Sequence, residues 1–312
     1  MQRPIVSLTL MLVLTTLVSL ISCSPAPQAA VGTGSQGAAK AAPPLTISAI
    51  PDQDPEKLQR LYGKVADYLQ KELGVPVVYK PVTDNTAAVT AFKVGDLDLV
   101  WYGGLTGVQA RLQVSNAEVV AQRDIDAEFH TVFIANKASG LAPLQDSQGL
   151  QSLKGKTFTF GADTSTSGRL MPQYYLKQAG VALTDFKGEA GFSGSHDKTI
   201  KLVESGTYDA GALNEQVWQS RVDSKEVDLT KVQLIWRTPA YFDYHWVINP
   251  QVKQRYGADF PQKVQAAFLK LDASVADQKE ILDLFGAKKF IPSQKSNYDQ
   301  IEAVGRDIGK IQ

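Results

Sequence analysis

The chain has 312 residues, of which 44% are hydrophobic and 21% are charged, and this is the composition of an ordinary globular protein. Lysine and arginine together number 32, as do aspartate and glutamate, so the formal charges balance. A chain without an overall field does not attract nucleic acid or an anionic membrane, so the composition excludes these partner classes and favours a soluble protein with a small ligand. The length allows about two domains of roughly 150 residues.

The chain begins with a segment typical of exported proteins. Residues 1–22 are predicted to be a signal peptide, because a short basic start precedes an uncharged apolar run. This run ends in L-I-S-C, which resembles the bacterial lipobox, and Cys23 is the only cysteine of the chain. We therefore expect residues 23–44 to be a lipidated Cys23 followed by a flexible linker rich in Ala, Pro, Gly and Ser. A retained membrane anchor is the alternative, since about 20 apolar residues span a bilayer.

From residue 45 onward, short apolar runs alternate with helical patterns. In chain order the sequence predicts a strand at 45–50, a helix at 56–73, a strand at 76–81, a helix at 86–94, a strand at 97–102, a helix at 103–113 and a strand at 118–122. Asp54 and Pro55 suit the start of the first helix, and Gly74 suits its end. This alternation predicts a parallel sheet with helices on both faces.

A second alternating region follows an extended segment at 129–135. It contains predicted strands at 156–160, 208–213 and 232–236 and predicted helices at 169–178, 198–205 and 215–221. Residues 232–249 are apolar and aromatic with Pro239 in the middle, which favours an extended crossing, and three helices at 252–271, 275–284 and 297–311 end the chain. We predict two α/β lobes joined by two extended hinge crossings: residues 45–133 plus 240–312 form lobe 1, and residues 134–239 form lobe 2.

The stretch Gly161–Gly168, with sequence G-A-D-T-S-T-S-G, lies between a predicted strand and a predicted helix. Hydroxyl groups, unpaired N–H groups and the positive end of the helix meet there, as an anion site requires. No lysine follows the last glycine, so a small tetrahedral oxyanion is favoured over a nucleotide. A plain helix cap is the commoner reading of such a stretch. The ligand reading is favoured by loops that should converge at the carboxyl ends of strands, at 52–54, 83–86, 101–104, 163–168, 194–197, 214–215 and 241–246.

Six short motifs make residues 45–271 similar to a known family. They are I-P-D-Q at 50–53, P-V-T-D at 81–84, W-Y-G-G at 101–104, S-T-S-G at 165–168, A-L-N-E at 212–215 and Y-F-D-Y at 241–244. They resemble the periplasmic phosphonate- and phosphite-binding proteins of ABC transporters, in particular those described as selenate-binding. The resemblance implies a type II periplasmic binding protein of an ABC importer, which captures a phosphite-, phosphonate- or phosphate-type oxyanion between its lobes and presents it to a permease.

The resemblance also implies which residues bind the oxyanion. The hydroxyl groups of Ser165, Thr166 and Ser167 would hold it at the helix start. Tyr102 would donate to it from the first lobe, and His196 would face it from the second. An oriented hydrogen-bond donor is a simpler role for His196 than a catalytic base.

Three further positions concern the rest of the ligand. Glu215 and Asp243 match acidic residues that contact it in phosphonate binders, whereas Asn85 stands where many of these proteins have a tyrosine. A carboxylate repels a bound dianion unless a proton lies between them. Phosphoryl-type anions have a second pKa of about 6 and can carry that proton, so the two carboxylates favour them over sulfate and selenate. Alternatively, the carboxylates pair with neighbours such as Arg237 or Lys198.

The remaining signals point away from catalysis and metal binding. The three histidines show no metal-ligand spacing, no G-x-S-x-G motif is present, and no cofactor is expected. His130 is predicted to be structural. His245 is predicted to pack among the aromatic residues around it, with a role in the site as the alternative. We expect a monomeric binding protein, lipid-anchored outside the cytoplasmic membrane. The alternatives are a selenate- or sulfate-type binder, a ligand sensor for a membrane receptor, and a secreted phosphatase or transferase.

Overall fold

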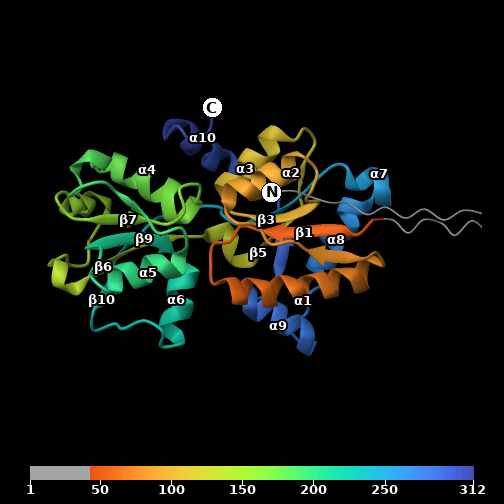
Figure 1. Ribbon diagram of the computed structural model, residues 1–312, viewed down its shortest axis with the longest axis horizontal. Coiled ribbons are helices and arrows are strands. Elements are labelled where there is room, and N and C mark those ends of the chain that lie inside the picture. Colours follow the sequence, from red (N-terminus) through yellow and green to blue (C-terminus); the bar gives the residue numbers. More distant parts are fainter. Residues whose placement is uncertain (1–42) are drawn as a thin grey trace, which may run out of the picture. The chain divides into compact units, whose positions relative to one another are not determined.

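Two five-stranded sheets organise residues 43–312, which are the residues that the computed structural model describes (Figure 1). The predicted signal peptide, Cys23 and nearly all of the predicted linker lie outside the described residues. We call the part of the chain built on the first sheet the first lobe, and the part built on the second sheet the second lobe. Between residues 43 and 312, no helix is both long and apolar enough to cross a membrane.

The first sheet has the strand order β2-β1-β3-β11-β4. Strands β1 (Leu45–Ala49), β2 (Val77–Tyr79) and β3 (Leu99–Tyr102) are parallel. In contrast, β11 (His245–Ile248) runs antiparallel between β3 and β4 (Glu118–Val119). The predicted all-parallel sheet is therefore wrong here. The reason is that β11 returns from the second lobe and enters the sheet at the end where β3 leaves it, with His245 opposite Tyr102.

The helices of the first lobe mostly follow the predicted pattern. Asp54 accepts the N–H groups of Glu56 and Lys57, both at 3.0 Å, and Gly74 ends the first helix with φ of 67°. The predicted helix at 252–271 is instead two helices, because Gly257 interrupts it with φ of 106°. The helices and the small antiparallel strand pair of this lobe are α1 (Pro55–Leu73), α2 (Asn85–Lys93), α3 (Gly104–Gln113), α7 (Val252–Tyr256), α8 (Phe260–Leu269), α9 (Ala276–Phe285), α10 (Asp299–Asp307), β5 (Ala121–Arg123) and β12 (Phe290–Pro292).

The second sheet has the order β10-β6-β9-β7-β8. It is also mixed, because β6 runs antiparallel to both of its neighbours. Strand β6 begins at Thr131, before the predicted lobe boundary at 133/134. The strands and helices of this lobe are β6 (Thr131–Asn136), β7 (Phe158–Phe160), β8 (Gly191–Phe192), β9 (Ala210–Asn214), β10 (Val232–Arg237), α4 (Met171–Gln178), α5 (His196–Glu204) and α6 (Glu215–Asp223). Short 3₁₀ segments lie at 124–128, 137–139, 147–153, 183–185 and 295–298.

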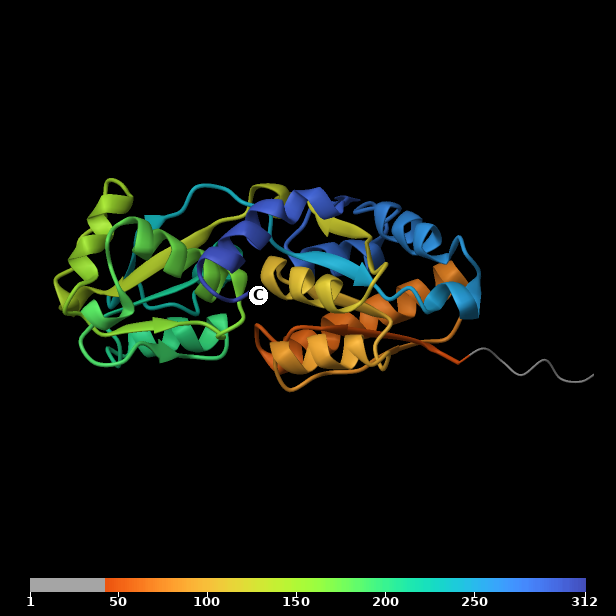
Figure 2. The ribbon, with the colours of Figure 1, turned by 90° about the horizontal axis from the view of Figure 1, so that it is seen from above.

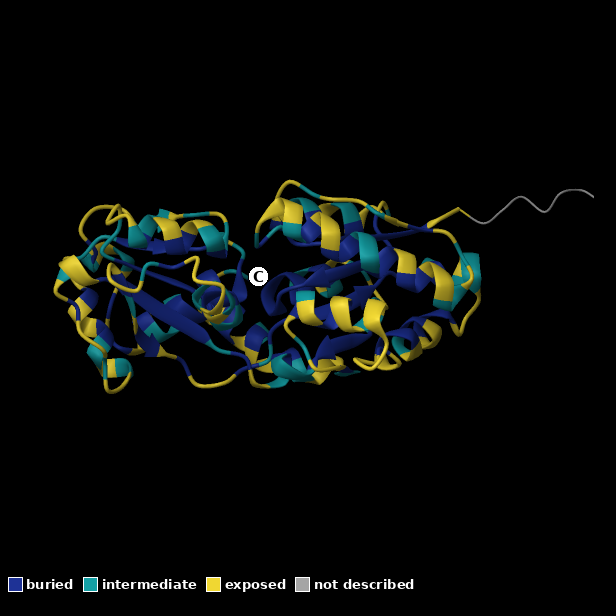
Figure 3. Cartoon of the chain, turned by 90° about the horizontal axis from the view of Figure 1, so that it is seen from below, coloured by how far each residue is buried: buried dark blue, intermediate teal, exposed yellow. Residues whose placement is uncertain are grey.

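Three apolar clusters form the core. One cluster fills the first lobe, and the two smaller ones cover opposite faces of the second sheet. Figure 3 shows buried strands in both lobes, with exposed residues on the outer helix faces. Leu170 and Met171, at the start of the helix that follows the oxyanion stretch, are fully buried and belong to the first-lobe cluster. The start of this second-lobe helix is therefore held against the first lobe.

Candidate functional site

The oxyanion turn, which we define as Gly161–Gly168, folds back over the strand that precedes it. The N–H group of Gly161 donates to the carbonyl of Gly168 at 2.8 Å, and Ser165 Oγ accepts the N–H of Gly168 at 2.9 Å. A Cβ on Gly168 would lie 3.1 Å from the Cα of Gly161. Both glycines are thus required by this close approach. A π-helical turn at Thr166–Leu170 then leads into α4, so the hydroxyl residues stand at a helix start as predicted.

The oxyanion turn meets the start of a first-lobe helix. Thr166 Oγ accepts the N–H of Leu105, in the first turn of α3, at 2.9 Å. The adjacent N–H of Gly104 donates to Asp243 Oδ1 at 2.8 Å. Two helix N-termini, one from each lobe, therefore meet around Thr166 and Asp243. Helix N-termini carry partial positive charge and unpaired N–H groups, so this junction favours an anion.

Three buried polar atoms at this junction have no hydrogen-bond partner within residues 43–312. They are Ser167 Oγ, Asp243 Oδ2 and Asn85 Nδ2, on residues that are 1%, 0% and 3% exposed. A buried polar group without a partner costs about 1–3 kcal/mol. Such atoms are therefore rare unless a ligand completes their hydrogen bonding, and these three belong to segments that the sequence had assigned to the oxyanion site.

Asp243 is the acidic residue that faces this junction. Its complete burial raises the pKa of the carboxyl group to about 8, partly offset by the hydrogen bond from Gly104. At neutral pH the group is therefore mainly a neutral acid, whose O–H can donate to an anion. This changes the argument made from the sequence, because a neutral Asp243 does not repel sulfate or selenate by charge.

Glu215 lies elsewhere, in an ion pair with Arg237. Arg237 Nη2 donates to Glu215 Oε2 at 2.8 Å, and Nε donates to Oε1. Both residues, together with His130, line a separate cavity of about 990 Å³. The alternative pairing with Arg237 is thus present in the structure, and the implied contact between Glu215 and the ligand stays a prediction.

His196, which was predicted to be an oriented hydrogen-bond donor, has protein partners for both of its ring nitrogens. The Nδ1 atom accepts the N–H of Asn214 at 3.4 Å, and Nε2 lies 3.3 Å from the hydroxyl of Tyr244. That hydroxyl donates to Asp52 Oδ2 at 2.6 Å and accepts from Asn214 Nδ2 at 3.2 Å. His196 is 1% exposed, and burial lowers its pKa. The imidazole is thus a neutral member of a network between the lobes.

Tyr102 also has a protein partner. Its hydroxyl donates to the carbonyl of Ala88 at 2.9 Å, and its ring packs edge-on against Phe92. The side chain is fully buried. Because a hydroxyl has one proton, Tyr102 does not offer that proton to an oxyanion in this arrangement. The first main-chain N–H groups of α3 have protein acceptors as well, because Gly104 donates to Asp243 and Leu105 donates to Thr166.

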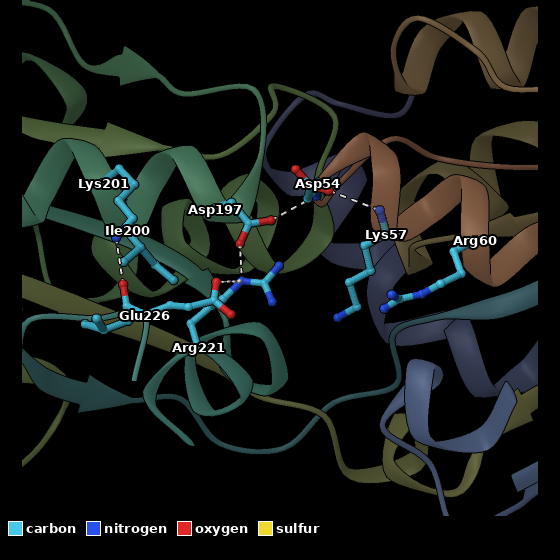
Figure 4. Close-up of a pocket in the computed structure, with 9 residues that line it drawn as sticks. Asp54, Lys57, Arg60, Asp197, Ile200, Lys201, Arg221 and Glu226 are labelled. Atoms are coloured by element: carbon cyan, nitrogen blue, oxygen red, sulfur yellow. Dashed lines mark hydrogen bonds and ion pairs between the residues drawn. The ribbon is translucent and has the colours of Figure 1, made fainter. Parts of the chain in front are cut away.

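A cleft cavity of about 570 Å³ lies between the two lobes beside this junction. Parts of four predicted loops line it, and Asn85 is among its lining residues. These parts are Gln53 and Asp54, Thr83 to Thr86, Asp163 and Thr164, and Gly194, Ser195 and Asp197. A neighbouring pocket of about 340 Å³ shows how the lobes touch (Figure 4). There Asp197 accepts the N–H of Asp54 at 3.0 Å and Arg221 Nε at 2.6 Å.

Reasoning from the sequence missed three members of the site region, namely Asp52, Tyr244 and Asn214. All three lie inside quoted motifs, in I-P-D-Q, Y-F-D-Y and A-L-N-E. The motifs therefore held the signal, although it could not show that these residues contact one another. His245 is buried and stacks on Tyr298 with ring centroids 3.8 Å apart, as a packing role requires. Across the described part of the chain, no group of three or more potential metal-ligating side chains is present.

Most of the described chain matches a known protein family. The family described as "ABC transporter, phosphonate, periplasmic substrate-binding protein" matches residues 47–298. A relative described as "Probable ABC transporter phosphite binding protein PhnD1", from Prochlorococcus marinus (strain MIT 9301), is 49% identical over 268 residues, which cover 86% of this chain and 90% of the relative.

Solved structures agree with this match. A structure of PhnD1 from Prochlorococcus marinus (MIT 9301) in complex with methylphosphonate has a TM-score of 0.84 at 49% identity, covering 86% of this chain and 98% of that chain. A binding protein component of an ABC phosphonate transporter from Pseudomonas aeruginosa has a TM-score of 0.72 at 21% identity, covering 84% of this chain and 85% of that chain, and this likeness concerns the fold alone. The predicted type II periplasmic binding protein fold is confirmed.

Proposed function

Because this chain belongs to the family of periplasmic substrate-binding proteins of ABC phosphonate transporters, we propose that the junction between its lobes holds the phosphorus oxyanion. The protein is the periplasmic binding component of a phosphonate or phosphite importer, and it catalyses no reaction. Its partners are a small phosphonate-type ligand and the permease of the transporter. PhnD1 in complex with methylphosphonate supports the choice of a phosphite or a small phosphonate as ligand.

The proposed ligand contacts are the buried polar atoms without partners. Ser167 Oγ and Asn85 Nδ2 donate to the oxyanion, and the protonated Asp243 donates through Oδ2. The first main-chain N–H groups of the helical turn that begins at Thr166 add further donors. Ser165 and Thr166 accept the N–H groups of Gly168 and Leu105, which positions both hydroxyls, and each hydroxyl keeps its proton to donate to the oxyanion as well. The observation that carries this assignment is the meeting of two helix N-termini around Thr166 and Asp243.

Closure of the lobes is the proposed capture step. The ligand lies between groups of both lobes, so it binds the closed form more tightly than the open form and shifts the population towards closure. The chain passes between the lobes just before β6 and again after β10, in the segment that leads to Tyr241. The bridge between Phe129 and Tyr241 holds the two crossings side by side.

Calorimetric titration tests the proposed ligand and site together. The ligands are phosphite, methylphosphonate, phosphate, sulfate and selenate, and the proteins are the wild type and Ser167→Ala. We expect phosphite or methylphosphonate to bind most tightly and the variant to bind each ligand more weakly. Tighter binding of sulfate or selenate than of every phosphorus anion would contradict the ligand assignment. Unchanged affinities in Ser167→Ala would contradict the site.

Two further properties of the protein complete the proposal. We infer that Cys23 carries the lipid anchor, which places the protein on the periplasmic side of a membrane, and that the folded part is a monomer. Loss of membrane association in Cys23→Ser, with the protein still exported, is the expected result for the anchor. Light scattering of the soluble part should give the mass of one chain.

A further inference from the structure

The C-terminal segment of the chain reaches the junction of the lobes as part of the first lobe (Figure 2). It folds back on α10, because the N–H groups of Lys310 and Ile311 donate to the carbonyl of Gly305 at 2.7 and 3.0 Å. The side chains of Ile301, Val304 and Ile311 belong to the first-lobe core. The position of Lys310 is therefore fixed by the packing of the first lobe.

Lys310 contacts an acidic residue of the second lobe within the oxyanion turn. Its Nζ lies 2.8 and 2.7 Å from the two carboxylate oxygens of Asp163. The Lys310 side chain is 21% exposed, and its main-chain carbonyl accepts Gln109 Nε2 at 2.9 Å. Asp163 lines the cleft cavity and precedes Ser165 by two positions. A first-lobe cation thus holds the one acidic residue of the oxyanion turn.

A second cation near Asp163 belongs to the second lobe, like Asp163 itself, and lies farther from the carboxylate than Lys310 does. Arg169 Nε is 3.7 Å from Asp163 Oδ1. Its guanidinium group lies over the rings of Phe160 and Phe192, with distances to the ring centroids of 4.3 and 4.9 Å. Arg169 follows the oxyanion turn along the chain and therefore stays near Asp163 whether the lobes are open or closed. Of these two cations, only Lys310 belongs to the first lobe.

We propose that Lys310 completes the oxyanion site by neutralising Asp163 when the lobes close. An uncompensated carboxylate beside a bound anion is repulsive, and a cation from the opposite lobe removes that repulsion only in the closed arrangement. Closure and anion capture therefore favour one another through a residue that touches no ligand. This role rests on the proposed function, and it makes Lys310 a positioning residue that tunes affinity.

A second ion pair across the same junction provides a matched control. Lys177 Nζ, in the last turn of α4, lies 2.7 Å from Asp307 Oδ1 at the end of α10. Both side chains are about half exposed, at 52% and 44%. This pair joins the same two lobes at the far end of α4 from the oxyanion turn. Its loss removes a contact between the lobes and leaves the charge at the turn unchanged.

The test is a double-variant cycle with methylphosphonate as the probe, measured by calorimetry at about 20 mM and about 500 mM NaCl. The proteins are the wild type, Lys310→Ala, Asp163→Asn, the double variant and Lys177→Ala. We expect Lys310→Ala to weaken binding about threefold to fivefold at low salt and less at high salt. Asp163→Asn and the double variant should both stay within about twofold of the wild type, because no carboxylate is left to neutralise. Lys177→Ala should also stay within about twofold.

Other results would overturn the inference. Equal losses in Lys310→Ala and Lys177→Ala would reduce Lys310 to a general contact between the lobes. The same loss from removing Lys310 in the Asp163→Asn background would show that Asp163 is not its target. An unchanged Lys310→Ala, beside a weakened Ser167→Ala, would refute this inference and leave the proposed function intact. A wild type that binds neither methylphosphonate nor phosphite would refute the proposed function instead. Thermal unfolding of each variant verifies that it is folded.

Discussion

Two groups of buried polar residues lie where the lobes meet, and they are built in opposite ways. The side chains of Asp52, His196 and Asn214 all bond to the Tyr244 hydroxyl at 2.6 to 3.3 Å, and the main-chain N–H of Asn214 donates to His196 at 3.4 Å. At the oxyanion turn, Ser167 Oγ and Asp243 Oδ2 have no partner in the described chain. A network whose hydrogen bonds are complete stabilises the arrangement of the lobes. Polar groups without protein partners can instead form hydrogen bonds with a ligand. Substitutions in the two groups should therefore separate stability from affinity.

Removal of the hydroxyl group at the centre of the satisfied network should have the largest effect. In Tyr244→Phe, Asp52 loses a donor, and His196 and Asn214 lose their shared acceptor. We expect the free energy of unfolding to fall by about 2–4 kcal/mol, because each buried group left unsatisfied costs about 1–3 kcal/mol. Denaturant unfolding measures this change. A loss below about 0.5 kcal/mol would show that the network around Tyr244 does not stabilise the fold.

Removal of an unsatisfied hydroxyl should have the opposite signature. Ser167→Ala deletes a buried group without a protein partner, so we expect the free energy of unfolding of the ligand-free protein to stay unchanged or to rise, by up to about 3 kcal/mol. The affinity for methylphosphonate should fall about 10- to 100-fold, because a hydrogen bond to a charged group contributes about 1.5–3 kcal/mol. Calorimetry and denaturant unfolding on the same preparation test both halves. A destabilised variant with unchanged affinity would erase the contrast between the two groups.

The titration of Asp243 should appear in the pH dependence of binding. Burial raises its pKa to about 8, and the protonated form is the one that donates to an anion. Binding is therefore strongest below that pKa and is lost as the pH rises through it, by about tenfold at pH 9. Asp243→Asn keeps a donor that does not titrate. The ratio of wild-type to variant affinity between pH 6 and 9 removes the titration of the ligand itself, and a constant ratio would contradict the role of Asp243.

Tyr102 provides a smaller test, because its hydroxyl has a protein partner although the resemblance implied a ligand contact. Tyr102→Phe leaves the carbonyl of Ala88 without this donor, and we expect a loss of about 1 kcal/mol in the free energy of unfolding. The affinity for methylphosphonate should stay within about twofold of the wild type. A tenfold loss of affinity would return Tyr102 to the ligand site.

Glu215 should show the smallest effect of the series. Its ion pair with Arg237 is partly exposed, with 30% of the Glu215 side chain accessible, and such pairs contribute about 0–1 kcal/mol. We expect Glu215→Gln to leave the affinity for methylphosphonate within about twofold of the wild type. Calorimetry with a phosphonate that carries an amino group extends the test, because selective weakening of that ligand would restore the role implied by the resemblance.

The sequence predicted the architecture better than the contacts. Local signals were sufficient for the cap at Asp54, the helix that follows the oxyanion turn and the alternation of strands with helices. The antiparallel course of β11 and the breadth of the network around Tyr244 depend on pairings between residues far apart in the chain, which local patterns do not contain. The hydroxyl groups at 165–167 were placed correctly at a helix start, but which of them is already bonded depends on Leu105 and Gly168.

For His196 and Glu215, residue type alone does not show which protein groups they bond. Each is a polar residue at the end of a strand or the start of a helix, which suits a ligand contact as well as a contact between lobes. The outcome depends on nearby partners: Tyr244 and Asn214 for the histidine, and Arg237 for the glutamate. A sequence shows that such partners exist, whereas only the folded chain shows that they are within bonding distance.

The position of β11 has a consequence for how the chain folds. This strand lies between β3 and β4, although more than a hundred residues of the second lobe separate it from them in sequence. The second sheet, in contrast, is built from one continuous stretch, from β6 to β10. We therefore expect the second lobe to acquire its structure first, since the first sheet needs a long loop to close before β3 is paired on both sides. A chain that stops before residue 245 would leave that edge of β3 open, and open strand edges promote aggregation.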